Sequence, residues 1–329
     1  MRQRTLLSLF GAALLVLIGP PLITTGSGAE TGTNIPGLQF MVPNTPGGGY
    51  DITARTAAKD AEDAKLNHNI EVFNLPGAGG TVGLSRLVNE RGNGKLAMSM
   101  GLGVVGAVRT NDSPSTLADA TPIARTVEEP DIVVVSKDSK YKTFEQLLAD
   151  WKKKPDKLPV GGGSSAGGPD HLAPMLMARD AGIEPKSVNY VPFDGGGELL
   201  ASVLGGKVAF GISGISEYRD QIKSGELRLL AVTGKKRIKG FDAPTLKESG
   251  LDVETQNWRM VAGAPGISDA DKTALVDAVG KMAESEPWKN IVSQKGWQNT
   301  FLAGADFETY LAGEIEKTGA VLKSLGIAQ

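Results

Sequence analysis

The sequence predicts an α/β protein with two lobes, each built on a mostly parallel sheet. After residue 36, short apolar runs alternate with amphipathic stretches, a spacing that is typical of βαβ units. The 329 residues are enough to bury two separate cores. In the middle of the chain, Ile132–Val135 is a continuous apolar run, which indicates a strand buried on both faces.

The expected elements follow one another with glycine-rich turns between many of them. The expected strands are Leu38–Val42, Ile70–Asn74, Leu96–Met100, Ile132–Ser136, Leu158–Val160, Val188–Val191, Val208–Ile212, Leu227–Val232 and Trp258–Ala262. The expected helices are Ile52–Leu66, Val82–Glu90, Thr143–Lys153, His171–Ala181, Glu198–Leu204, Ile215–Ser224, Asp269–Glu284, Pro287–Lys295 and Phe307–Leu325.

The chain is expected to leave the first lobe, build the second and return. The first lobe would comprise residues 36–132 and 258–329, and the second residues 133–257. The two crossings, at 132–136 and 258–262, would then form a two-stranded hinge. The alternative is a single sheet with a multi-helical cap.

The N-terminus has the order of a secretory signal. Arg2 and Arg4 precede the apolar stretch Leu6–Ile18, and the small residues Ser27–Ala29 resemble a cleavage site. Residues 1–29 are therefore expected to be a signal peptide, with an uncleaved membrane anchor as the alternative. Either interpretation places the remainder of the chain outside the cytoplasm.

Composition excludes several classes of function. The net charge of −2 and the pI of about 5.9 argue against a nucleic-acid-binding surface, for which a stripe of basic residues is expected. The absence of cysteine excludes disulfides, thiolate metal sites and a lipid anchor on cysteine. With two histidines and scattered carboxylates, neither a metal site nor a cofactor is expected.

Four glycine-rich segments each follow an expected strand and open an expected helix. They are "NTPGGGYD" (44–51), "NLPGAGGTVG" (74–83), "GGGSSAGGPDH" (161–171) and "PFDGGGELL" (192–200). Helix N-termini carry unpaired N–H groups and a positive dipole end, and glycine lets an anion approach them closely. Four such loops favour a shared anionic ligand in a cleft outside the strand ends.

Side chains near these loops have more ordinary interpretations. Asp51 is expected to cap the first helix, and Tyr50 to line a pocket or cover the loop. No arginine falls inside the four loops, so backbone N–H groups rather than guanidinium groups are expected to hold the anion. Arg55 is the nearest guanidinium in the sequence, and a surface or interlobe ion pair is expected for it.

One of the loops also matches an enzyme motif. Gly163-Ser164-Ser165-Ala166-Gly167 has the pattern of a nucleophile elbow between a strand and a helix, with Ser165 as the nucleophile. The two histidines, His68 and His171, do not occupy the late position from which such enzymes present their base. An α/β-hydrolase-like enzyme is therefore the alternative to a binding protein.

With these motifs in order, the chain resembles the extracytoplasmic solute-binding subunits of tripartite tricarboxylate transporters, the Bug family. The resemblance covers nearly everything after residue 36 and includes "VNYVPFDGGGELLASVLGGKVAFGISG", "GELRLLAVTGKKR" and "NWRMVAGAPG". It implies a periplasmic-binding-protein-like fold, the "Venus flytrap", in which two lobes close on a carboxylate. It also implies a periplasmic or cell-surface location and the membrane permease subunits as partners.

The resemblance implies a set of ligand-binding residues, all in the four loops. They are Gly48, Gly49, Tyr50, Asp51, Gly77, Ala78, Gly79, Gly80, Thr81, Ser164, Ser165, Gly167, Gly168, His171, Asp194, Gly195 and Gly196. The segment 101–106, "GLGVVG", is expected to border the same cleft. Tricarboxylates such as citrate, C4-dicarboxylates and aromatic carboxylates all suit these loops.

Overall fold

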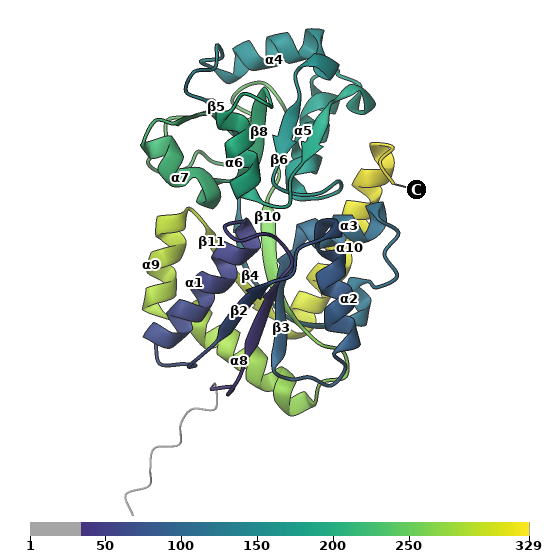
Figure 1. The fold of residues 1–329 in the computed structure, drawn as a ribbon, viewed down its shortest axis with the longest axis vertical. Coiled ribbons are helices and arrows are strands. Elements are labelled where there is room, and N and C mark those ends of the chain that lie inside the picture. Colours follow the sequence, from purple (N-terminus) through teal and green to yellow (C-terminus); the bar gives the residue numbers. More distant parts are fainter. Residues whose placement is uncertain (1–33, 329) are drawn as a thin grey trace, which may run out of the picture. The chain divides into compact units, whose positions relative to one another are not determined.

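Two sheets, each with helices around it, organise the part of the chain that the structure describes (Figure 1). This structure is a computed structural model, and it describes residues 34–328. The expected signal peptide, 1–29, lies outside the described residues. No helix within residues 34–328 is both long and apolar enough to cross a membrane.

The first lobe is built on a six-stranded sheet with the order β11-β4-β10-β3-β1-β2. Its strands are β1 (Gln39–Val42), β2 (Glu71–Asn74), β3 (Leu96–Gly101), β4 (Thr121–Glu129), β10 (Asn257–Gly263) and β11 (Gln298–Ala303). Its helices are α1 (Gly49–Asp63), α2 (Thr81–Asn89), α3 (Leu102–Thr110), α8 (Asp269–Glu284), α9 (Glu286–Lys295) and α10 (Gly304–Ser324).

The second lobe is built on a five-stranded sheet with the order β7-β6-β8-β5-β9. Its strands are β5 (Asp131–Ser136), β6 (Val160–Gly162), β7 (Tyr190–Pro192), β8 (Phe210–Gly214) and β9 (Leu227–Val232). Its helices are α4 (Phe144–Lys153), α5 (Pro169–Asp180), α6 (Gly196–Leu204) and α7 (Ile215–Lys223). Figure 1 shows these elements in teal and green.

The expectation of mostly parallel sheets is wrong, because both sheets are mixed. In the first, β1, β2 and β3 are parallel, whereas β10 runs antiparallel to β3 and β4. In the second, β6, β7 and β8 are parallel, whereas β5 is antiparallel to β8 and β9. The reason is connectivity: β5 and β10 each enter their sheet from the other lobe. They therefore start at the edge where the parallel strands end.

Local sequence explains how helices cover both faces of each sheet. In α4, the N-cap Thr143 accepts a hydrogen bond from the backbone N–H of Gln146, and the apolar residues are buried at helical spacing. Trp151 of this helix packs edge-on against Phe210 of β8, with ring centroids 5.3 Å apart. The cores of the two sheets form separate apolar clusters.

The chain crosses between the lobes twice, and its last helix adds a packing contact between them. It crosses from β4 to β5 at Pro130 and returns between β9 and β10. In addition, Leu322 and Leu325, at the end of α10, pack against Leu172 and Met175 of α5 in the second lobe. The end of the first lobe's last helix therefore rests on the second lobe.

Three elements were not expected from the sequence: α3, β4 and β11. The segment 101–106 was expected to be a loop at the cleft, and its glycines do lower helix propensity. Tertiary packing overrides this, since α3 is buried from Leu102 to Ala107. Irregular pairing hides the periodicity of β4 and β11, because register shifts interrupt the β4 pairings with both β10 and β11.

Candidate functional site

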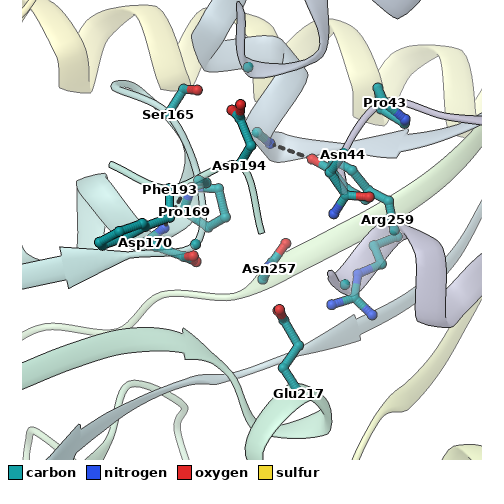
Figure 2. Close-up of a pocket in the computed structure, with 16 residues that line it drawn as sticks. Pro43, Asn44, Ser165, Pro169, Asp170, Phe193, Asp194, Glu217, Asn257 and Arg259 are labelled. Atoms are coloured by element: carbon teal, nitrogen blue, oxygen red, sulfur yellow. Dashed lines mark hydrogen bonds between the residues drawn. The ribbon is translucent and has the colours of Figure 1, made fainter. Parts of the chain in front are cut away.

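A cavity lies where loops at the strand ends of the two sheets meet. The space between its lining atoms is about 520 Å³ when the open mouth is included, and the part that can hold the centre of a water-sized group is about 50 Å³. Figure 2 shows side chains from both lobes around it. The lining residues are Pro43, Asn44, Gly49, Tyr50, Gly79, Gly103, Gly163, Ser164, Ser165, Pro169, Asp170, Phe193, Asp194, Glu217, Asn257 and Arg259.

All four glycine-rich loops reach this region, since they follow the carboxyl ends of β1, β2, β6 and β7. In open α/β sheets this edge is where ligands bind. The expected site residues that line the cavity are Gly49, Tyr50, Gly79, Ser164, Ser165 and Asp194. The expected residues outside the lining are Gly48, Asp51, Gly77, Ala78, Gly80, Thr81, Gly167, Gly168, His171, Gly195 and Gly196.

Asp51 shapes the first loop from within the helix. The N-cap of α1 is Gly48, so the expectation that Asp51 is the N-cap is wrong. Its carboxylate instead accepts the backbone N–H of Gly47 at 2.9 Å and the side-chain amide of Asn74 at 2.9 Å. It also pairs with Nε of Arg55 at 2.9 Å, so Arg55 is engaged away from the cavity lining.

The second loop depends on left-handed backbone. Gly77, Gly79 and Gly80 have φ values of 141°, 64° and 95°, which side chains with a Cβ rarely adopt. Thr81 donates its hydroxyl hydrogen to the carbonyl oxygen of Ala78 at 3.0 Å, which tightens the turn. These residues hold Gly79 at the cavity rather than lining it themselves.

The remaining expected glycines allow close packing. Gly168 is the N-cap of α5. A Cβ on Gly195 would lie 2.5 Å from Oγ1 of Thr45, and one on Gly196 would lie 2.0 Å from Oε2 of Glu217. Any larger residue at 195 or 196 would therefore displace a neighbouring side chain.

Sequence reasoning missed the polar floor of the cavity. Asp170 comes from α5, Glu217 from α7, and Asn257 and Arg259 from β10. Asn257 and Arg259 are two residues apart in a strand, so they share a face, and two polar residues on one face of an apolar strand were the available signal. The other lining residues not expected are Pro43, Asn44, Gly103, Gly163, Pro169 and Phe193.

Arg259 lines the cavity, so it is nearer to the site than Arg55. The surface ion pair expected for Arg55 is confirmed by its contact with Asp51. The side chain of Arg259 is 1% exposed and forms an ion pair with the buried carboxylate of Glu129. It also donates to Oγ1 of Thr53 at 2.8 Å. A buried arginine that is already paired offsets one negative charge, and here its Nε–H is left without an acceptor among the described residues.

Four carboxyl groups gather around this single guanidinium. Glu129 accepts the backbone N–H and the hydroxyl of Ser216, both at 2.9 Å. Burial, and then the charge of Glu129, raises the pKa of Glu217 to about 8. Burial, and then Glu129, also raises the pKa of Asp131 to about 7. The pKa of Asp170 is raised well above its ordinary value by burial and then by Asp131.

The two lobes touch at the cavity. The backbone N–H and hydroxyl of Thr45, in the first lobe, both donate to the carbonyl oxygen of Asp194 in the second, at 3.1 and 3.0 Å. Thr110 of α3 donates its hydroxyl to the carbonyl of Ala166 at 2.8 Å. These contacts hold loops of both lobes around one volume.

The hydrolase alternative needs a base for Ser165, and the structure gives His171 another role. Nδ1 of His171 accepts the backbone N–H of Gly167 at 2.9 Å, and the ring packs on Tyr190. His68 is on the exposed segment between α1 and β2. Among the described residues, no group of His, Asp and Glu side chains is arranged to hold a metal ion.

His171 should make stability depend on pH. Burial lowers its pKa to about 4 from an ordinary value of 6.5, so the unfolded chain binds the proton more readily between these values. Stability is therefore lost as pH falls through this window. We expect the difference in unfolding free energy between wild type and His171→Gln to shrink by about 1 kcal/mol from pH 7 to pH 5.5. Urea titrations at both pH values measure it.

His68→Gln is the matched control, because His68 is exposed. Its difference from wild type should be the same at both pH values. A pH-independent difference for His171→Gln would contradict the prediction.

Comparison with known proteins identifies relatives over nearly the whole described chain. Residues 53–327 match the model of the tripartite tricarboxylate transporter family receptor. Protein BugT of Bordetella pertussis is 26% identical over 322 residues, which cover 95% of this chain and 97% of that protein.

Solved structures share the two-lobed fold. The periplasmic binding protein BugD superposes with a TM-score of 0.81 at 21% identity, covering 88% of this chain and 98% of BugD. An R. palustris protein solved with adipate superposes with a TM-score of 0.82 at 24% identity, and the match covers 90% of this chain and 98% of that protein. MatC from Rhodopseudomonas palustris, solved with bound malate, superposes with a TM-score of 0.73 at 21% identity. This match covers 87% of this chain and 98% of MatC. These likenesses establish the periplasmic-binding-protein fold.

Proposed function

Because the chain belongs to the tripartite tricarboxylate transporter receptor family, we propose that it captures a small carboxylate between its lobes and delivers it to the membrane subunits of such a transporter. The observation that carries the proposal is the cavity of about 520 Å³, to which strand-end loops of both sheets contribute. The family is one of solute-binding receptors rather than enzymes, and its periplasmic-binding fold implies an extracytoplasmic location. The expected signal at 1–29 is consistent with export.

We propose that the ligand's carboxylate is held by the glycine loops. Gly49 and Gly79 bring backbone close to the cavity, and Ser164 and Ser165 add hydroxyl groups. Hydrogen bonds to a charged group contribute about 1.5–3 kcal/mol each, so a few of them can support micromolar binding after ordering costs. The adipate and malate bound by two proteins of the same fold support a small carboxylate.

We further propose that the lobes, residues 36–132 with 258–329 and residues 133–257, close on the ligand. Loops of both lobes line one cavity, so a ligand makes its full set of contacts only when the lobes are together. This differential affinity would shift the population toward the closed form. The permease subunits could then distinguish loaded from empty protein.

Calorimetric titration of the exported protein with citrate, malate and adipate tests the function. We expect a dissociation constant in the micromolar range for at least one acid. A saturating dose, about 100 times that constant, should raise unfolding free energy by about 2.7 kcal/mol. If no small carboxylate gave either a heat of binding or a thermal shift, the result would contradict the proposal. Ester hydrolysis that Ser165→Ala abolishes would instead support the hydrolase.

A further inference from the structure

The floor of the cavity carries more carboxyl groups than basic groups. Asp170 and Glu217 line it together with Asn257, and Asp194 lies at the more exposed rim. The only guanidinium in the lining, that of Arg259, is already paired with Glu129 behind it. A ligand that carried only carboxylates would bring negative charge to a floor that has two carboxyl groups and no cation that is not already paired.

Asn257 adds an unsatisfied acceptor at the same place. The residue is 7% exposed, and its Nδ2 donates to Asp131 at 3.4 Å. In this amide orientation, Oδ1 has no hydrogen-bond donor among the described residues. Figure 2 shows Asn257 between Asp170 and Arg259, with its oxygen turned away from Glu217 toward the middle of the site. A buried acceptor without a donor costs free energy that a ligand can recover.

The carboxyl groups of the floor have few donors of their own. One hydroxyl, that of Ser213, lies 3.0 Å from Oε1 of Glu217 and 3.4 Å from Oδ2 of Asp170, and its single hydrogen can serve only one of them. Burial first, and neighbouring acids second, raise the pKa of both carboxyls, so a nearby positive charge would favour their ionised form. A cation placed between them would supply both the charge and the missing donors.

We propose that the ligand is an amino-carboxylate, whose ammonium group binds between Asp170, Glu217 and Oδ1 of Asn257. This inference rests on the proposed carboxylate-binding function and specifies its substrate class. An ammonium group has three N–H donors, one for each of these acceptors. The ligand's carboxylate then faces the glycine loops, where Gly79, Ser164 and Ser165 line the cavity.

Matched pairs of acids test this on the wild-type exported protein. Glutamate is titrated against glutarate, and 2-aminoadipate against adipate, by calorimetry. We expect the amine-bearing member of at least one pair to bind about 10-fold tighter or more, as a charge-assisted hydrogen bond implies. Equal or tighter binding of the amine-free acids in both pairs would overturn the inference and leave the proposed function standing. That outcome would favour protonated floor carboxyls that donate to the ligand.

Binding of neither class, nor of citrate or malate, would overturn both this inference and the proposed function. Charge-removing variants then locate the ammonium group. Glu217→Gln and Asp170→Asn should each reduce the ratio of amine-bearing to amine-free affinity by about 10-fold. Glu198→Gln, an exposed acid on α6, should leave the ratio unchanged.

The ratio separates this role from a structural one, because a merely loosened site would weaken both members of a pair alike. Circular dichroism establishes that each variant is folded before titration. If the variants do not fold, the wild-type pairs still decide the question.

Discussion

Replacing Gly106 by alanine should weaken ligand binding by about 100-fold, which corresponds to roughly 2.7 kcal/mol. Gly106 is in α3 of the first lobe, and a Cβ there would lie 1.9 Å from the carbonyl oxygen of Gly167 in the second. The obstructing atom is backbone, so a side-chain rotation cannot relieve the overlap. The lobes would have to separate at the edge where Thr110 bonds to Ala166. Calorimetry measures the affinity of a ligand identified with wild type.

The variant should remain folded, because alanine has the higher helix propensity. Small-angle scattering should give wild type a smaller radius of gyration with saturating ligand than without it, and this contraction should be lost in Gly106→Ala. Gly197→Ala is the matched control, since a Cβ at Gly197 meets nothing within 4 Å. Wild-type affinity and contraction in Gly106→Ala would contradict lobe closure as the binding mechanism.

Replacing Glu217 by glutamine should stabilise the ligand-free protein at pH 7. Burial raises the pKa of Glu217 to about 8 from 4.5, so its contribution to stability is complete below pH 4.5 and is lost as pH rises toward 8. The full shift corresponds to about 3 kcal/mol at pH 7, and the partial exposure of the side chain lowers the expected gain to about 2 kcal/mol. Glutamine keeps an acceptor for Ser213. Urea unfolding at pH 7 measures the gain.

The pH dependence identifies the cause of this gain. The advantage of Glu217→Gln over wild type should shrink from pH 7 to pH 5. The folded carboxyl is already protonated at pH 7, and the unfolded carboxyl takes up more of its proton as the pH approaches 4.5. Glu198→Gln should show neither a gain nor a pH-dependent difference. A destabilised Glu217→Gln at pH 7 would contradict a raised pKa and indicate a carboxylate that the fold stabilises.

The loops of the site could be predicted because their signal is local. A burst of glycines between an apolar run and an amphipathic run marks a strand end and a helix start, whatever surrounds it. This reasoning located the four loops, and Gly49, Gly79, Ser164 and Asp194 within them, which the family resemblance also implied, line the cavity. It extended the loops too far, however, because α1 already begins at Gly49 and α6 at Gly196.

The floor of the site could not be predicted in the same way. Arg259 meets Glu129 across 130 residues of sequence, and only the crossing of β4 and β10 near the lobe boundary brings them together. Glu217 and Asp170 come from different helices of the second lobe. The spacing of residues in the sequence cannot predict such contacts, because they depend on how the two sheets are arranged around the cavity.

The sequence by itself determined the alternation of strands and helices, the glycine loops at the strand ends and the resemblance to a receptor family. Each of these depends on local backbone preference or on an ordered set of motifs. Only the tertiary structure decided the mixed strand directions, the burial of α3 and the acidic floor beside Arg259. Burial and charge act through space, so a carboxyl acquires its environment from segments that the chain order does not relate.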